Sequence, residues 1–123
     1  MMSQQPIALA SEKLDPAEVR RLVKAWFVDM VKVVVDVRRS CAAVGGELHA
    51  DAEQLLLEGG SEQADLWGAN YYPGRGAEGC IEFTAMINIR PSQGNAGMEI
   101  QDRDIRQRVR DVVLRVLGRG EPL

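Results

Sequence analysis

The stretch VKVVVDVR, residues 31–38, decides the fold class of this chain. Its odd-numbered positions are all valine, whereas the charged residues Lys32, Asp36 and Arg38 stand at even-numbered ones. Successive side chains of a strand point to opposite faces, so this alternation of β-branched and charged residues predicts a β-strand with one apolar face. The segments on either side must then contain the other strands of a sheet and the helices that pack on its apolar face.

The segment before this strand begins as a helix. Asp15 can cap the helix, Pro16 suits its first position, and Glu18 has the spacing of a capping box. Apolar residues then recur at three- and four-residue steps from Val19 to Phe27, which predicts an amphipathic helix that ends near residue 27 or 28. The same register would also allow a longer helix that runs into the valine-rich stretch.

The segments after the strand are interrupted by a glycine pair at residues 45–46. Beyond it, two apolar runs separated by Gly59-Gly60-Ser61 predict a β-hairpin over residues 54–72. A short helix over residues 50–57 is the competing interpretation, because Ala, Glu, Gln and Leu favour helices. Residues 80–90 show the clearest alternation in the chain and predict another strand, which Pro91 ends.

A second helix is predicted over residues 102–117, with Asp102 and Asp104 at its start and Gly118 at its end. The order of helix, strands and helix predicts an α+β fold: a mostly antiparallel sheet of about four strands, with the N-terminal and C-terminal helices packed on one face. We expect residues 1–123 to form a single domain. Residues 1–14 form its N-terminal segment, which can be flexible, and residues 118–123 form a short tail.

Composition and charge limit the classes of function. The 123 residues are 46% hydrophobic and 27% charged, with a formal net charge of −3, which is ordinary for a globular protein. The acidic balance argues against nucleic-acid binding, and Asp–Arg pairs at i,i+4 account for half of the arginines in the last helix. Without a membrane-length apolar run or a secretory signal, we expect a cytoplasmic protein with no membrane partner. Cys41 and Cys80 lack metal-type spacing and are expected to be reduced thiols.

The only histidine lies in an acidic strip, since residues 40–74 contain six acidic residues and no Lys or Arg. In a strand, His49, Asp51 and Glu53 would project from one face as a candidate catalytic or metal site. An imidazole with two carboxylates suits Mn, Fe or Zn, and it also suits acid–base chemistry. In a helix, Asp51 would face away from the other two. The sequence leaves strand and helix open over residues 47–53, and the common alternative is a surface or hydrogen-bonding histidine.

A second group of candidate ligand-binding residues lies at the end of the strand predicted for residues 80–90: Asn88, Arg90, Gln93 and Asn95. The group runs into a glycine-containing loop, where binding residues commonly concentrate, and arginine offers a donor fork for a carboxylate or phosphate. The structural alternative is that Arg90 pairs with an acid of the His49 region and that Asn95 takes a left-handed turn conformation.

The segment LWGANYYP, residues 66–73, adds Trp67 and Asn70 as candidate ligand-binding residues. Amphipathic aromatic rings can line a ligand pocket or a protein interface. The alternative, which we favour for Trp67, is that the ring fills the core beside a close backbone approach at Gly68.

Three motifs carry a resemblance to a known family: GGELHAD at residues 45–51, DLWGAN at 65–70, and INIRPSQGN at 87–95, which MEI follows at 98–100. Through this combination, residues 33–113 resemble a family of small bacterial proteins catalogued as a domain of unknown function. The resemblance implies no reaction, cofactor or catalytic residue.

Two classes of function fit these residues. The first is a protein that binds a small molecule or a divalent metal, a hydrolase being one form of it, with its site at the His49 strip and Arg90. The second is a non-enzymatic interaction module that forms a homodimer through an exposed edge at residues 31–37. Convergence of His49, Asp51, Glu53 and Arg90 in one concave pocket would favour the first class.

Overall fold

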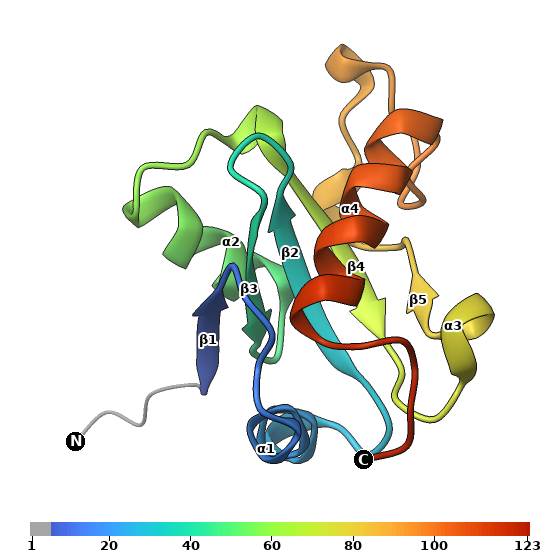
Figure 1. The fold of residues 1–123 in the computed structure, drawn as a ribbon. Helices are drawn as coiled ribbons and strands as arrows, with labels where there is room; N and C mark the ends of the chain where they lie inside the picture. The colour runs from blue at the N-terminus through green and yellow to red at the C-terminus, as the bar shows by residue number, and fades with distance from the viewer. Residues whose placement is uncertain (1–5) are drawn as a thin grey trace.

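The structure, a computed structural model, describes residues 6–123 and contains a five-stranded antiparallel sheet of order β1-β3-β2-β4-β5 (Figure 1). The strands are β1 (Ile7–Ala10), β2 (Val31–Asp36), β3 (Cys41–Gly45), β4 (Leu66–Tyr71) and β5 (Ile81–Glu82). This confirms the predicted α+β class, with one strand more than expected. Part of the predicted N-terminal segment forms the edge strand β1, and residues 1–5 of that segment lie outside the described residues.

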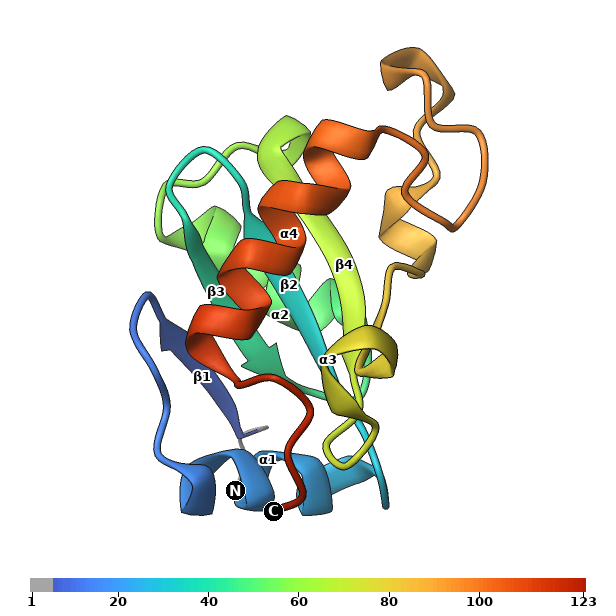
Figure 2. The same ribbon diagram turned by 45° about the vertical axis from the view of Figure 1, so that its right-hand side comes forward.

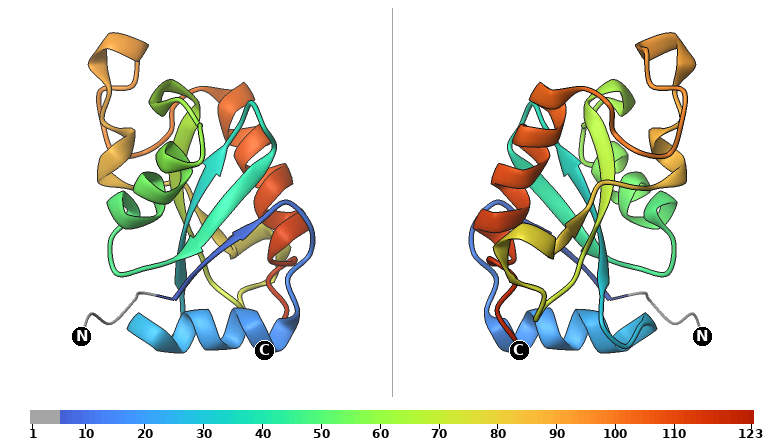
Figure 3. Two further views of the ribbon diagram at one scale, coloured as in Figure 1. Left: turned by 90° about the vertical axis from the view of Figure 1, so that its left-hand side faces the viewer. Right: turned by 90° about the vertical axis from the view of Figure 1, so that its right-hand side faces the viewer.

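The helices form layers on both faces of this sheet. They are α1 (Pro16–Trp26), α2 (His49–Glu58), α3 (Gly76–Gly79) and α4 (Arg103–Val116), with 3-10 turns η1 (Gln63–Asp65), η2 (Met86–Asn88) and η3 (Pro91–Gln93). The predicted N-terminal and C-terminal helices, α1 and α4, share the larger apolar cluster on one face. Helix α2 packs on the opposite face (Figures 2 and 3).

Strand β2 is the centre of the sheet, because it pairs with β3 on one side and with β4 on the other. Val33 and Val35 face the α1–α4 layer, whereas Val34 faces α2, and all three are fully buried. The predicted strand is confirmed, but its second face is covered rather than exposed. The edge at residues 31–37, on which the dimer hypothesis depended, is therefore an interior strand. The homodimer itself stays a prediction.

Helix boundaries follow the capping signals of the sequence. Asp15 accepts a hydrogen bond from the Ala17 N–H at 2.8 Å and begins α1. Asp102 accepts from the N–H groups of Asp104 and Ile105 and begins α4. Side-chain oxygens at these positions satisfy amide groups that have no partner within the helix.

The predicted hairpin over residues 54–72 is half wrong. Its second arm is β4, but its first arm belongs to helix α2, the competing interpretation. Ala52 and Leu56, one helical turn apart, pack against Val34 and Leu66 of the sheet. Burial of this apolar stripe, added to the helix-favouring residue types, decides for a helix.

The strand predicted for residues 80–90 is also wrong beyond its first residues. Only Ile81–Glu82 pair with β4; the chain then makes an isolated bridge between Thr84 and Glu99 and turns through η2 and η3. The alternation predicts burial correctly only at Phe83 and Ala85, whereas Ile89 of the predicted apolar face is 44% exposed, and Asn88 and Arg90 of the predicted polar face are buried. Apolar periodicity does not show whether the backbone finds a strand to pair with, and without that pairing the faces of this segment are not those of a strand.

Strand β3 and the pairing of β1 with it were not predicted, because Gly45-Gly46 indicated only a break. Gly45 has φ +115°, and a Cβ at this position would lie 2.4 Å from the Pro6 carbonyl oxygen. The glycine therefore permits β1 to approach the end of β3 closely.

Candidate functional site

A cavity of about 510 Å³ lies between the N-terminus of α2, the β2–β4–β5 side of the sheet and the segment 84–98. Its apolar lining consists of Leu48, Ala50, Ala85, Met86, Ile87 and Met98. Its polar lining consists of Lys32, His49, Asn70, Glu82 and Thr84. Two of the residues predicted from the sequence, His49 and Asn70, thus meet in one concave site.

His49, the first residue of α2, is held against strand β4. Its Nε2 lies 2.8 Å from the Ala69 carbonyl oxygen, and only 8% of the residue is exposed. A carbonyl can only accept, so Nε2 carries the hydrogen and Nδ1 is left as an acceptor in the neutral ring. Burial lowers the pKa of His49 to about 4; the hydrogen bond to Ala69 opposes this shift and the charge of Lys32 adds to it. The ring is therefore neutral at pH 7.

This depressed pKa makes folding stability depend on pH in a defined window. An unfolded chain binds a proton at His49 below its ordinary pKa of 6.5, whereas the folded protein does not until about pH 4. The free energy of unfolding should therefore fall by up to about 3 kcal/mol as the pH drops through this window. The chain has one histidine, so its NMR titration gives the pKa directly.

The variant His49→Gln is the control for this pH dependence. Urea unfolding at several pH values between 7 and 4.5 should show that the free energy of unfolding falls less steeply for the variant than for the wild-type protein. Parallel declines, or a titration midpoint near 6.5 for the folded protein, would contradict a buried neutral ring.

Asn70, a residue of the cavity lining, has a buried side-chain acceptor without a donor. Its Nδ2 donates to Glu82 Oε1 at 2.8 Å and lies 3.5 Å from the Thr84 carbonyl oxygen. Both neighbours are acceptors, which fixes the orientation of the amide. Oδ1 is buried and receives no hydrogen bond from any described residue while the His49 ring is neutral, and a hydrogen bond between the Asn70 side chain and the ring favours only the charged form of His49.

The structure separates the three members of the predicted His49 site. Asp51 accepts a hydrogen bond from the Leu48 N–H at 3.2 Å and so caps α2. Glu53 follows His49 by one turn and is buried, with Oε2 unbonded. Within residues 6–123 no three His, Cys, Asp or Glu side chains are grouped to hold a metal ion. The helix removes the shared face that a metal or catalytic triad required.

Arg90 is used to fix the backbone. Its guanidinium donates to the carbonyl oxygens of Leu66, Gln63 and Ile87 and stacks over the buried Trp67 ring, 4.5 Å from its centroid. Burial lowers the pKa of Arg90, and the charge of Glu53 partly offsets this. Glu53 is thus the acid of the His49 region that acts on Arg90, without a direct ion pair.

Asn88 and Asn95 serve the same structural purpose as Arg90. Asn88 Oδ1 accepts the Gly68 N–H at 2.8 Å, and Nδ2 donates to the Gly68 and Met98 carbonyl oxygens, each at 3.0 Å. Asn95 Nδ2 donates to the Asn88 carbonyl oxygen at 2.8 Å. These predicted ligand-binding groups are therefore already occupied by backbone partners.

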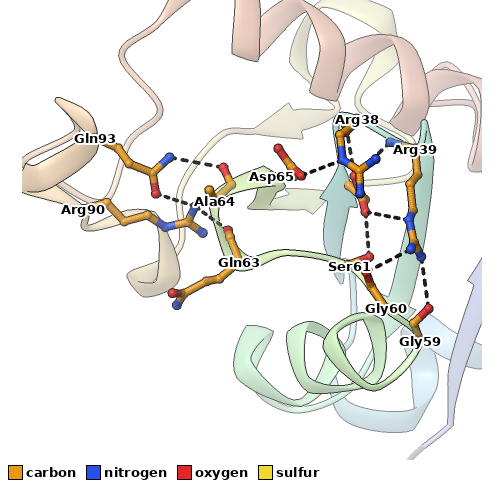
Figure 4. A network of polar contacts seen from close by, with 11 residues as sticks. Arg38, Arg39, Gly59, Gly60, Ser61, Gln63, Ala64, Asp65, Arg90 and Gln93 are labelled. Atoms are coloured by element: carbon orange, nitrogen blue, oxygen red, sulfur yellow. Dashed lines mark hydrogen bonds and ion pairs between the residues drawn. The ribbon is translucent and has the colours of Figure 1, made fainter.

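Figure 4 shows how the remaining polar residues near η1 are used. Gln93 donates to the Ala64 carbonyl oxygen beside Arg90, and Arg38 pairs with Asp65 at 3.0 Å. Asp36, fully buried, accepts from the Ser61 hydroxyl at 2.6 Å and from backbone N–H groups of the β2–β3 turn. This network closes the β2–β3 turn, and none of its residues lines the cavity.

Packing also accounts for several arginines of α4. Arg108 pairs with Asp104 at 3.1 Å, as its spacing predicts. Arg106 instead stacks on the Phe83 ring and donates to the Ile100 carbonyl oxygen, and Arg115 donates to the Ser11 and Ser40 carbonyl oxygens. Such contacts leave these guanidinium groups less available to phosphates.

Lys32, Glu82 and Thr84 also line the cavity and were not among the site residues predicted from the sequence. Lys32 and Glu82 did stand on the polar faces of predicted strands, which was the available signal. Strand register was needed to place them: Lys32 lies opposite Asn70, and Asn70 lies opposite Glu82.

Comparison with known proteins identifies a family but no relative of known activity. The model of a family described as a protein of unknown function (DUF5674) matches residues 8–116, a range that includes the whole cavity lining. No curated protein and no solved structure matches the chain. Within residues 6–123 no helix combines the length and the apolar character needed to cross a lipid bilayer.

Proposed function

We infer the function of this chain, which belongs to the DUF5674 family of proteins of unknown function, from its cavity. We propose that the protein binds a small molecule that has an apolar body and a head group that donates hydrogen bonds. The cavity volume of about 510 Å³ falls within the range of about 300–1,000 Å³ typical of small-molecule sites. The observation that carries the proposal is the buried, unpaired Oδ1 of Asn70.

The apolar body would be held by the rim of the cavity. Leu48, Met86 and Met98 are large hydrophobic side chains that line it and are more than 40% exposed. Exposed apolar surface gathered around a hollow is typical of binding sites. Methionine side chains adapt to ligands of irregular shape, which suits a mainly apolar guest.

The head group would be held by acceptors. An unpaired acceptor in a buried position destabilises the empty protein by about 1–3 kcal/mol, and a donor from a ligand removes that penalty. His49, neutral with Nε2–H directed at Ala69, adds Nδ1 as an acceptor, and Glu82 adds a carboxylate. A pKa near 4 makes His49 a weak base at neutral pH, so binding is better supported than hydrolysis through this residue.

Three probes of equal apolar size test this function: 2-phenylethylamine, 2-phenylethanol and ethylbenzene. Titration followed by two-dimensional NMR should move the amide signals of the cavity residues, with the two donor-bearing probes binding about ten-fold more tightly than the hydrocarbon. In Asn70→Leu this preference should become weaker, because only His49 Nδ1 and Glu82 remain as acceptors, while ethylbenzene binds as before. Gln54→Leu, an exposed amide on α2 outside the cavity, is the matched control.

Signals that stay unmoved in the cavity for all three probes would reject the proposed function. If Asn70→Leu is folded by circular dichroism and still prefers 2-phenylethylamine over ethylbenzene as strongly as the wild-type protein does, Asn70 is not a group that binds the head of the ligand.

We further propose a cytoplasmic location. Cys41 and Cys80 are free thiols, and burial raises the pKa of each, which suppresses the reactive thiolate. Reduced, unreactive thiols are typical of proteins in a reducing compartment.

A further inference from the structure

Resting on the function proposed above, we propose that the ligand is a zwitterion: a free α-amino acid with an apolar side chain. Its carboxylate would pair with Lys32, and its ammonium group would be bound by Asn70 Oδ1 and Glu82. The apolar side chain would then occupy the space between Leu48 and the two rim methionines.

Strand register places the three polar residues in a row. Lys32 on β2 is the cross-strand partner of Asn70 on β4, and Asn70 is the partner of Glu82 on β5. Directly opposed residues project from the same face of a sheet. Neighbouring strands are about 4.8 Å apart, so the backbones of Lys32 and Glu82 are about 10 Å apart with the free acceptor of Asn70 between them.

Neither charge in this row is neutralised within the described part of the chain. The Lys32 ammonium makes no ion pair or hydrogen bond there and lies 5.5 Å from the centroid of the Phe27 ring. Glu82 accepts only from neutral donors, Asn70 Nδ2 and the Tyr72 hydroxyl. Elsewhere, by contrast, acids and arginines form pairs such as Arg38–Asp65 and Arg108–Asp104.

The arrangement discriminates between charge types. A ligand with only a positive charge would share the cavity with the Lys32 ammonium, and a ligand with only a negative charge would share it with the Glu82 carboxylate. Unfavourable like-charge contacts are the usual source of such selectivity. A zwitterion satisfies both groups, and its ammonium also supplies the donor that Asn70 Oδ1 lacks.

Deletion analogues of one amino acid test the inference. L-phenylalanine, 2-phenylethylamine, which lacks the carboxylate, and 3-phenylpropanoate, which lacks the amine, are titrated into the full chain by calorimetry and NMR. We expect L-phenylalanine to bind about ten-fold or more tightly than either analogue. L-leucine with 3-methylbutylamine and 4-methylpentanoate repeats the comparison for an aliphatic body.

Variants that each remove one charged side chain show which residue binds which end of the ligand. Lys32→Met should remove the preference for L-phenylalanine over 2-phenylethylamine, and Glu82→Gln should remove the preference over 3-phenylpropanoate. Glutamine keeps an acceptor for Asn70 and Tyr72, so the fold is preserved. Lys24→Met and Glu12→Gln, exposed residues outside the cavity, are the matched controls and should leave all affinities unchanged.

The outcomes separate this inference from the proposed function. If 2-phenylethylamine binds the cavity as tightly as L-phenylalanine and Lys32→Met changes neither affinity, the zwitterion is overturned while a small-molecule site remains. If no probe moves the cavity signals, or if all probes act elsewhere, such as at Phe83 and Arg106, both are overturned.

Discussion

Replacement of Asn88 by alanine is expected to lower the free energy of unfolding by about 4 kcal/mol, because it leaves buried backbone groups unpaired. Asn88 is fully buried and bonds to both the N–H and the carbonyl of Gly68, and to the carbonyl of Met98. Its amide thus imitates a peptide group and stands where a neighbouring strand would pair with β4. Urea unfolding monitored by tryptophan fluorescence measures the loss.

Two further variants show whether hydrogen bonds are the cause. Asn88→Asp keeps an acceptor for the Gly68 N–H but directs its second oxygen at two carbonyls, so its pKa should rise in the folded state. The loss in free energy of unfolding of Asn88→Asp relative to the wild-type protein should therefore be larger at pH 7 than at pH 4.5, where the protonated carboxyl can donate a hydrogen bond. Gln93→Ala, which removes an exposed amide of the same loop, should change the free energy of unfolding by less than about 1 kcal/mol. Equal losses in the free energy of unfolding for Gln93→Ala and Asn88→Ala would refute the role assigned to Asn88.

The second large effect is expected at Gly68, where any side chain collides with the packing behind the cavity. A Cβ at this position would lie 2.6 Å from the Ala85 Cβ, 3.1 Å from His49 Cδ2 and 3.2 Å from Ile87 Cγ1. Gly68→Ala should therefore lower the free energy of unfolding by about 3 kcal/mol, and Gly68→Val should prevent folding. Thermal and urea unfolding of the purified variants give the magnitude.

A second-site change tests whether the collision itself is responsible. Ala85→Gly removes the closest atom, so the double variant Gly68→Ala/Ala85→Gly should be more stable than Gly68→Ala alone. Gly97→Ala, where a Cβ would meet nothing within 4 Å, is the matched control and should be nearly neutral. A double variant no more stable than the single one would show that the crowding at Ala85 is not the cause.

These two residues connect stability to the cavity. Gly68 admits the His49 ring and Ala85 to the sheet surface, and Asn88 ties β4 to the carbonyl of Met98. The same segment 84–98 forms one wall of the cavity. Variants at either position that still fold should therefore weaken the binding of 2-phenylethylamine as well as the fold, which a probe titration of folded Asn88→Ala and Gly68→Ala would measure.

Elements whose signals are local could be predicted from the sequence. Asp15 and Asp102 cap α1 and α4 as their positions indicated, and the apolar stripes of both helices are buried in the expected layer. The valine-rich strand was also recognisable. In each case, the hydrogen-bond donors or the apolar periodicity lie within one element, so no distant residue has to be known.

The errors arose where the partner of a segment lies far away in the chain. Residues 80–90 alternate like a strand, yet Asn88 takes the place beside β4 that strand pairing would have filled. His49 and Glu53 stand in a segment whose composition allowed both strand and helix, and burial of Ala52 and Leu56 against the sheet chose the helix. Residue types alone do not contain that information.

The α+β class, the two capped helices, the central strand, and His49 and Asn70 as residues of interest could be predicted from the residues alone, because these features depend on local spacing and residue chemistry. The folded chain, by contrast, was needed to show that Asn88, Arg90 and Asn95 are hydrogen-bonded to backbone groups. It also brought Lys32 and Glu82 to either side of Asn70. Hydrogen-bond partners and strand register depend on contacts between segments that are distant in the chain, and residue spacing does not specify those contacts. Polar groups that look equivalent along the chain thereby become either part of the scaffold or part of the cavity.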